Sequence, residues 1–337
     1  MKVLFSTVVR SAPVEKGGEV VFADLGAKTV VATAPVVPSD PLVDDPNPRG
    51  NSRGGRGIAL LDGEVIVAGY HSLHCFRHDL TPTRKVTHPL MVGVHEVHLT
   101  PQRTLWVTAT AVDAALEFDV RSGTALRQIW PREEDRFQQA LNLTPLQIDK
   151  TIDNRLGFLS RAHLEHPSHL HFNAIALYGS ELHGLFNNFG VIANLDRREI
   201  AFADPALRGA HNLFIRDQLA FVSSTLSGAI HIFDLPDWRR RQTIDLTRFP
   251  WARRLLRAEQ RRVLARRVKR KIRIVSRVAA KPLFVRGLDG QGEVLVVGVS
   301  PATVLVIDWR RDELLDAFHY SDDVNVAVHG LKVIDWG

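Results

Sequence analysis

A short pattern of three apolar strands recurs along this chain of 337 residues, and one copy is divided between the two ends. Each copy has an apolar strand, a turn, a second apolar strand, a turn of small residues and a third strand that ends in Asp. The complete copies begin at Arg56, His95, Asn173, His211 and Gly287. Residues 2–25 supply the last two strands of a copy, and residues 328–337 supply its first. Five complete copies and one divided copy make six repeats.

Each repeat is rich in Val, Ile, Leu and Phe between turn residues, which is typical of a short antiparallel sheet. Such a sheet cannot bury both of its faces alone, whereas radial stacking buries them between neighbouring sheets. Pairing of the N- and C-terminal strands then closes the ring. The sequence therefore predicts an all-β fold, a six-bladed β-propeller that takes residues 1–337 as a single domain. A parallel α/β fold is the alternative, but no helical patterns alternate with the strands.

Three segments do not fit the repeat. Residues 131–168 have a partly helical pattern and join the third and fourth repeats. Residues 248–281 join the fifth and sixth, and their core, 251–271, places Leu and Val near one face of an Arg-rich helix. Residues 38–57 are rich in Pro and Gly and predict a loop. Because all three precede an innermost strand, we expect the two partly helical insertions and the loop on one face of the disc, over the channel.

The net charge of +6 belongs to one segment. Residues 248–281 hold 14 Lys or Arg and a single acid, so the remainder of the chain carries −7. This basic helical insertion is either a solvated cover of the disc or a docking surface for an acidic partner. No aromatic residues interleave with its arginines, which argues against nucleic acid as the partner.

The composition also narrows the compartment. Cys75 is the single cysteine, so no internal disulfide framework is possible. No apolar run approaches the ~20 residues that span a bilayer, and residues 1–10 read as a strand, not as a signal peptide. We therefore expect a cytoplasmic protein without a membrane partner.

The first strand of each propeller blade lines the central channel, so the first residues of the six repeats should meet near one end. In blade order these are His329, Arg56, His95, His171 with Asn173, His211 and Arg286. Imidazoles that converge from neighbouring strands are good ligands for a divalent transition metal such as Fe, Cu, Zn or Mn. We predict metal binding by His95, His171 and His211, with His329 as a fourth ligand or as an acid–base group. Strand alternation points Glu96 away from the face of His95.

The remaining candidates concern the substrate. Arg56 and Arg286 flank His329 and suit a carboxylate or phosphate group. Asn212 is a further candidate for substrate binding, and Asn173 is a candidate catalytic residue beside His329. The sequence contains no Walker-type phosphate loop and no G-x-S-x-G nucleophile elbow.

Three functions agree with these residues. The first is a metal-dependent enzyme that acts on a small anionic metabolite in the channel, by oxidation with iron or copper, or as a lyase, hydrolase or isomerase with zinc or manganese. The second is a metal-free lyase or cyclase that uses a channel histidine as general base. The third is a propeller that binds or scaffolds a partner without catalysis.

Three motifs resemble those of an uncharacterised bacterial family of six-bladed propellers, H-x-N-G, P-H-S, and T-R-G-L followed by V-G-L-S. In this chain they read HFNA at 171–174, AHN at 210–212, and VRGL at 285–288 followed by VGVS at 297–300. Ala174 departs from the usual Gly, and Ala210 and Asn212 depart from Pro and Ser. The resemblance implies important roles for His171, Asn173, His211 and Arg286 but no particular reaction.

Two looser fold analogies bear on the metal. Carotenoid-cleaving oxygenases hold iron on a propeller axis with four histidines, which is similar to the set expected in this chain. Lactonase-type propellers surround a metal with Glu, Asn and Asp, and that set is not evident in this sequence.

Overall fold

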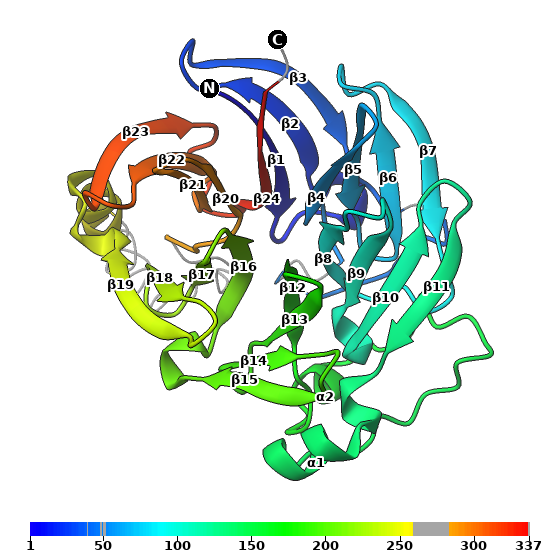
Figure 1. Cartoon of the computed structure of the whole chain (residues 1–337). Helices are drawn as coiled ribbons and strands as arrows, with labels where there is room; N and C mark the ends of the chain where they lie inside the picture. The colour runs from blue at the N-terminus through cyan, green and yellow to red at the C-terminus, as the bar shows by residue number, and fades with distance from the viewer. Residues whose placement is uncertain (39, 48, 50–51, 259–282, 336–337) are drawn as a thin grey trace, which may run out of the picture.

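The protein is a six-bladed β-propeller (Figure 1). The computed structural model describes all residues except 39, 48, 50–51, 259–282 and 336–337. Each blade is a four-stranded antiparallel sheet, and the six blades stand radially around a central channel. The predicted fold class is confirmed.

In each blade the strands follow one another from the channel outward. Blade 1 holds β24 (Val326–Ile334), β1 (Lys2–Val9), β2 (Glu19–Asp24) and β3 (Thr29–Pro35). Blade 2 holds β4 (Ile58–Leu61), β5 (Glu64–Ala68), β6 (Ser72–Phe76) and β7 (Pro82–Thr87). Blade 3 holds β8 (Val94–Leu99), β9 (Leu105–Ala109), β10 (Ala114–Asp119) and β11 (Thr124–Ile129).

The second half of the chain follows the same order. Blade 4 holds β12 (Phe172–Tyr178), β13 (Glu181–Phe186), β14 (Val191–Asn194) and β15 (Glu199–Ala203). Blade 5 holds β16 (Ala210–Arg216), β17 (Leu219–Ser224), β18 (Ala229–Asp234) and β19 (Arg239–Asp245). Blade 6 holds β20 (Leu288–Gln291), β21 (Val294–Val299), β22 (Thr303–Asp308) and β23 (Glu313–His319).

Every blade has one strand more than the three predicted. The fourth strands lie at the rim, and most residues of β3, β7, β11 and β19 are exposed or half-buried. Because such a strand packs little of its surface against a neighbouring blade, its sequence lacks the apolar run that marks the inner three. Blade 1 is therefore closed by three N-terminal strands and one C-terminal strand.

The ring is closed by hydrogen bonds and by apolar packing. β24 pairs antiparallel with β1 from Lys2↔Ile334 to Val9↔Val326. Phe5 of β1 lies edge-on to Tyr320 of the blade 6 side, with 5.3 Å between ring centroids. Closure within one sheet ties the C-terminal strand β24 to the N-terminal strand β1 and so joins the two ends of the chain.

Substitution of Gly330 by Ala is expected to destabilise this closure by about 2–4 kcal/mol. A Cβ atom at position 330 would lie 2.0 Å from the backbone oxygen of Arg56, and backbone cannot move aside cheaply. Urea unfolding of Gly330→Ala measures the loss. Gly26→Ala is the control, because the nearest atom to a Cβ there is a side-chain oxygen at 3.4 Å. Equal stability of the two variants would contradict the expectation.

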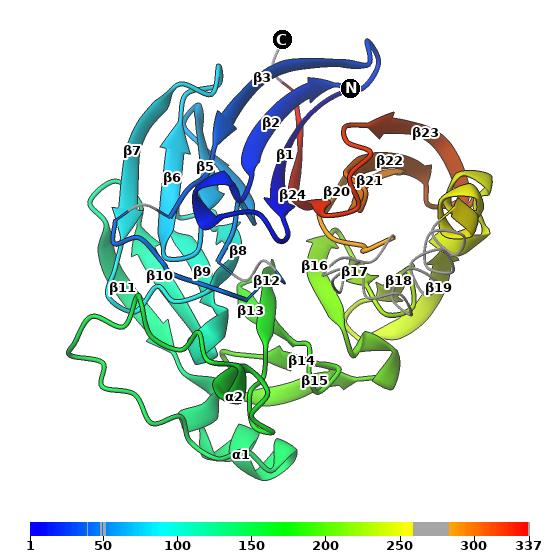
Figure 2. The same ribbon diagram turned by 180° about the vertical axis from the view of Figure 1, so that it is seen from behind.

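The insertions contain the helical segments. Residues 131–168 form η3 (Pro131–Glu133), α1 (Asp135–Leu141) and α2 (Arg161–Leu164). Four further single turns are η1 (Val14–Lys16), η2 (Thr110–Val112), η4 (Pro205–Leu207) and η5 (Leu246–Arg248). Residues 250–258 are helical, whereas the rest of the predicted basic segment, 259–281, lies outside the described residues. Figure 2 shows α2 and the segment that precedes β4 on the same face of the disc.

Within the part of the chain that the structure describes, no helix is long and apolar enough to cross a membrane.

Candidate functional site

A β-bulge places the channel residues of blade 3. β8 pairs with β9 at Val94↔Ala109 and again at Val97↔Val107, so two residues of β8 oppose one residue of β9. The two are His95 and Glu96, and strict alternation is lost between them. Because a bulge re-aims the side chains of its strand, both residues reach the channel. The expectation that Glu96 points away from the face of His95 is therefore wrong.

The same irregularity recurs at the entry of three other blades. The register of the innermost strand shifts between Phe172 and Ala174 in β12, and between Ala210 and Asn212 in β16. In blade 1, the shift lies opposite Ser6 of β1. The residues that these bulges add or re-aim are Asn173, His211 and His329. Blade 4 thus presents Asn173 at the repeated position, while His171 precedes β12 with a left-handed φ of 53°.

A buried hydroxyl stabilises three of the bulges. The extra residue leaves a backbone N–H without a strand partner, and a buried N–H is costly if nothing accepts it. The acceptors are Thr108 Oγ1 for Glu96 N at 2.8 Å, Ser223 Oγ for Asn212 N at 3.1 Å, and Ser6 Oγ for Gly330 N at 2.8 Å. These hydroxyl residues interrupt otherwise apolar second strands, and they are a sequence signal that the apolar repeat pattern does not capture.

Glu96 and Asn212 form a floor across the channel. Asn212 Nδ2 of blade 5 donates to Glu96 Oε2 of blade 3 at 2.9 Å, and the Asn212 oxygen accepts from the backbone N of Gly287 at 2.9 Å. Glycine at position 57 makes room for the carboxylate, because a Cβ there would lie 2.1 Å from Glu96 Oε1. Burial raises the pKa of Glu96 to about 7.

Four histidines meet at the repeated position next to this floor. We call His95, His171, His211 and His329 the histidine ring. Their ring centroids lie 4.5 Å apart for His95 and His329, 5.5 Å for His95 and His211, and 6.5 Å for three other pairs. The structure thus brings together, from three blades and the segment before β12, all four residues predicted as metal ligands.

Burial keeps these imidazoles neutral. Loss of solvent lowers the pKa of His171 to about 3 and lowers the pKa values of His95, His211 and His329 well below the usual 6.5. Neighbouring guanidinium groups of Arg56 and Arg286 add to this effect, since positive charges disfavour an imidazolium. A neutral imidazole keeps one nitrogen lone pair for a ligand.

Hydrogen bonds define which nitrogen of His211 holds the lone pair. Its Nδ1 lies 3.1 Å from the backbone oxygen of Gly209, which only accepts, so Nδ1 carries the proton. The Nε2 atom then holds the lone pair. Among the described residues, no hydrogen-bond partner meets His211 Nε2, His95 Nδ1 or His329 Nε2, although all three atoms are buried. Buried polar atoms without a protein partner indicate a place for a ligand.

Three arginines lie around the histidine ring. Burial lowers the pKa values of Arg10 and Arg56 to about 10 and that of Arg286 well below its usual value. The guanidinium carbons of Arg10 and Arg286 lie 4.1 and 4.2 Å from the ring centroid of Phe284. Sequence reasoning found Arg56 and Arg286 but missed Arg10, which directly follows β1 and precedes no repeat. Buried guanidinium groups that lie this close together favour a bound anion.

A cavity of about 80 Å³ is lined by His95 and His171, two members of the histidine ring. Its lining joins blade residues to both insertions on this face. The blades and the turns that enter them contribute Tyr70, Gly93, His95, Thr110, Ala111, His171 and Arg286, and the insertions contribute Arg49, Arg56, Phe158, Leu159 and Leu164. The segments at 38–57 and 131–168 therefore cover the mouth of the channel.

Four imidazoles are suitable ligands for a transition metal, and the distances between them determine how far they must move to bind one. A metal–nitrogen bond of ~2.1 Å places each ligating imidazole centroid ~3.2 Å from the ion, and hence two tetrahedral ligands ~5.2 Å apart. The histidine pairs whose imidazole centroids lie 4.5 and 5.5 Å apart bracket this separation, and the pairs at 6.5 Å exceed it. In the described portion of the chain, no three His, Cys, Asp or Glu side chains stand in metal-binding geometry. Binding by all four would need an inward movement of the wider members.

A buried pair that sequence reasoning missed supports His171. Asp113 Oδ2 lies 3.0 Å from His169 Nδ1 and accepts from the backbone N of Leu170 at 3.0 Å. The side chains of Asp113 and His169 are fully buried, and the His169 ring lies 5.5 Å from the ring of His171. This pair holds the backbone immediately before His171 in place.

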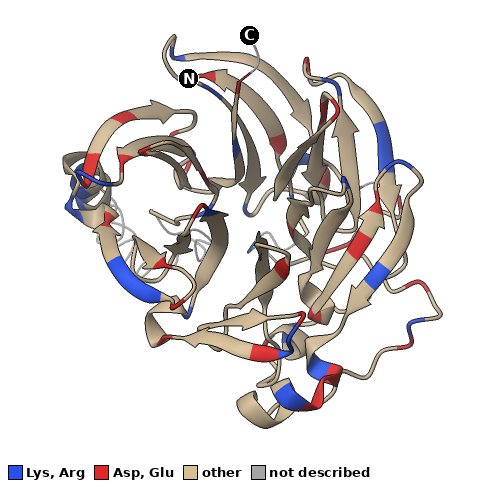
Figure 3. Cartoon of the chain, viewed as in Figure 1, with Lys and Arg blue, Asp and Glu red and all other residues tan. Residues whose placement is uncertain are grey.

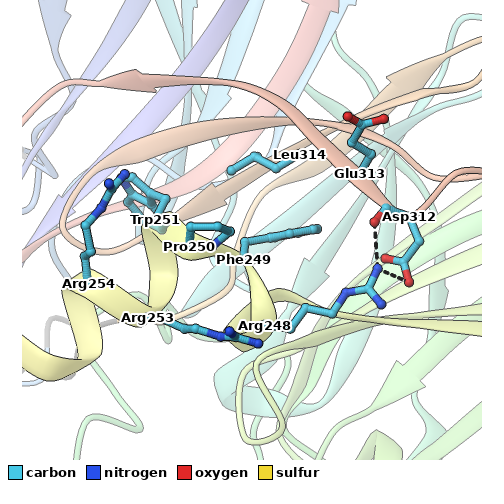
Figure 4. A pocket seen from close by; sticks show the side chains of 9 residues that line it. All are labelled: Arg248, Phe249, Pro250, Trp251, Arg253, Arg254, Asp312, Glu313 and Leu314. Carbon is cyan, nitrogen blue, oxygen red and sulfur yellow. Dashed lines mark hydrogen bonds and ion pairs between the residues drawn. The ribbon is translucent and has the colours of Figure 1, made fainter.

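The described part of the basic segment lies away from this site. Figure 4 shows a surface hollow between Arg248, Phe249 and Trp251 on one side and Asp312 and Leu314 on the other. Arg248 forms an ion pair with Asp312. Figure 3 shows that both signs of charge occur on the outer strands of the disc. An acidic partner at residues 251–271 stays a prediction, and most of that range lies outside the described residues.

No family model and no curated protein sequence matches the chain. Among solved structures, it is similar to a protein of unknown function from Bacteroides caccae, with a TM-score of 0.58, 10% identity, and coverage of 98% of this chain and 97% of that chain. A chain of a nidogen/laminin complex has a TM-score of 0.58 and 11% identity, with coverage of 98% and 97%. Identities this low show the fold alone.

The fold and the site define a class: a six-bladed β-propeller whose channel mouth is lined by neutral histidines and buried arginines. The motif resemblance to an uncharacterised propeller family finds no support in a matching family model.

Proposed function

We propose that this propeller is a metal-dependent enzyme that acts on a small anionic metabolite at the mouth of its channel. One observation carries the proposal: four neutral imidazoles meet there with three buried, unpartnered nitrogens among the described residues, directly beside buried guanidinium groups. His95, His171, His211 and His329 would hold a divalent transition metal. When bound, iron or copper would supply oxidative chemistry, and zinc or manganese would supply a Lewis acid.

The protein's own residues have separate tasks in this proposal. Arg56 and Arg286 bind the anionic group, and the attraction is strong because both are shielded from water. Asn173 Nδ2 donates to the backbone oxygen of Ala210 at 3.2 Å, which orients its buried Oδ1. That oxygen has no partner within the described chain and can accept a hydrogen bond from substrate. His329 is a fourth ligand or an acid–base group, and its buried Nε2 has no hydrogen-bond partner among the described residues.

The contacts of Asn212 favour a role in holding neighbouring residues of the site in position. Its amide nitrogen donates to Glu96, and its oxygen accepts from Ser223 Oγ at 3.0 Å and from Gly287 N at 2.9 Å. A side chain with these protein partners has little capacity left for a substrate. Direct contact between Asn212 and the substrate stays a prediction.

Incubation of the pure protein with a cellular metabolite extract tests the proposal. Mass spectrometry should detect an anionic metabolite that disappears when iron, copper, zinc or manganese is added. Arg286→Gln is expected to slow this loss about 10- to 100-fold, because a charge-assisted hydrogen bond contributes about 1.5–3 kcal/mol. Arg239→Gln, at a side chain that is 80% exposed, is the matched control.

Other outcomes discriminate the alternatives. Turnover that survives a chelator and the substitution His171→Ala would favour the metal-free lyase or cyclase. No turnover with any metal, together with unchanged metabolite levels, would favour a binding or scaffold protein.

A further inference from the structure

The lining of the cavity over His95 and His171 contains two kinds of side chain. We call Arg49, Arg56 and Arg286 the cationic wall. We call the insertion residues Phe158, Leu159 and Leu164 the apolar wall. A ligand that satisfies both walls must combine an anionic group with an apolar body.

Arg286 is a buried cation among other positive charges, and it lines the cavity. Burial, together with the positive charges of Arg10 and Arg56, lowers the pKa of Arg286. Buried positive charge of this kind is compensated when an anion binds.

The apolar wall is held in place by hydrogen bonds to the blades. His163 Nε2 of α2 lies 2.5 Å from the backbone oxygen of Ala111, and the hydroxyl of Tyr70 lies 3.5 Å from the backbone oxygen of Gly157. Phe158 packs edge-on against His163, with ring centroids 4.8 Å apart. The insertion therefore presents apolar side chains to the mouth in a defined arrangement.

The volume limits the ligand. The cavity measures about 80 Å³, and a single water needs ~10–15 Å³ of it, so roughly six water-sized volumes fit. That space corresponds to a ligand of roughly six to ten non-hydrogen atoms.

We propose that the ligand is a monocarboxylate with a compact apolar body, such as an aryl or branched alkyl group. Its carboxylate lies against Arg56 and Arg286, and its body lies against Phe158, Leu159 and Leu164. The inference rests on the proposed function for the place where the substrate binds, and it adds the chemical class of that substrate.

Isothermal titration with four probes tests this class: benzoate, acetate, succinate and benzyl alcohol. The chelator-treated full-length protein should bind benzoate at least 10-fold more tightly than any of the other three. Leu164→Asn should weaken benzoate about 10-fold and leave acetate unchanged, since it removes apolar contact alone. Leu156→Asn is the control, because Leu156 belongs to the same insertion, is 51% exposed and does not line the cavity.

The outcomes separate the two proposals. If acetate or succinate binds as tightly as benzoate and depends on Arg286, the apolar class is wrong and the anion site stands. If no probe binds in a manner that Arg286→Gln or Arg56→Lys weakens, both the inference and the proposed anion site fail. Thermal unfolding of each variant shows that the fold is intact.

Discussion

Untagged wild-type protein is expected to retain near one equivalent of a divalent transition metal, and a His171→Ala/His211→Ala variant is expected to retain none. His211 belongs to blade 5 and His171 to the segment before β12, and the centroids of their imidazoles lie 6.5 Å apart. Removal of two imidazoles leaves His95 and His329, which is fewer than the three protein ligands of an ordinary catalytic metal site. Elemental analysis by inductively coupled plasma mass spectrometry measures both proteins.

The control is a His78→Ala/His319→Ala variant, which removes the same number of imidazoles from exposed positions. It should retain as much metal as the wild type. Absence of metal from the wild type, with no uptake of added iron, copper, zinc or manganese, would contradict the metalloenzyme and leave the anion site to be judged separately.

The chelator-treated protein is expected to lose stability on the order of 8 kcal/mol between pH 7.5 and pH 5.5. Burial lowers the pKa values of His74 and His171 to about 3 and those of His98 and His231 to about 4. It also lowers the pKa values of His95, His211 and His329 well below 6.5. In the unfolded chain these groups take up protons below pH ~6.5, while in the folded chain they do not. Since the unfolded state binds more protons, the free energy of unfolding decreases as the pH is lowered, by about 1.4 kcal/mol for each histidine at pH 5.5.

Protonation of Glu96 has the opposite effect on the free energy of unfolding. Burial raises its pKa to about 7, so the folded state takes up a proton that the unfolded carboxylate binds only near pH ~4.5, and acid stabilises the fold there by about 2 kcal/mol. Urea unfolding at several pH values measures the net effect. His74→Gln should reduce the loss of unfolding free energy by about the contribution of one histidine. His319→Gln, at an exposed site, should leave that loss unchanged. A constant free energy of unfolding over this pH range would show that the buried histidines are not held neutral.

Much of the architecture was predictable because repetition is a property of the sequence itself. Val, Ile, Leu and Phe must be buried in each of the inner three strands, so six similar apolar patterns indicate six similar sheets. The residue that begins each pattern must then lie near the channel, which is how His95, His211, His329 and Arg286 were found. The fourth strands were not predicted because a strand at the rim buries too little surface to require an apolar pattern.

The details of the site depended on local exceptions to strand geometry. Alternation predicts that Glu96 and His95 face opposite sides, but the bulge against Thr108 turns both into the channel. Whether a strand bulges depends on hydrogen bonds to its neighbour, which alternation does not encode. The pair of Asp113 and His169 escaped for a similar reason, since its members are separated by 56 residues and meet through the fold.

By itself, the sequence determined the six-fold repeat, the closure of the divided blade and the identity of the polar residues at the strand entries, because each follows from burial along a single strand. The tertiary structure alone decided that each of the four imidazoles lies within 6.5 Å of at least two others, and that Arg10 joins Arg56 and Arg286. It also decided that the insertion at 131–168 gives the cavity its apolar wall. Those features depend on distances between blades, which are set by packing around the ring and not by any one strand.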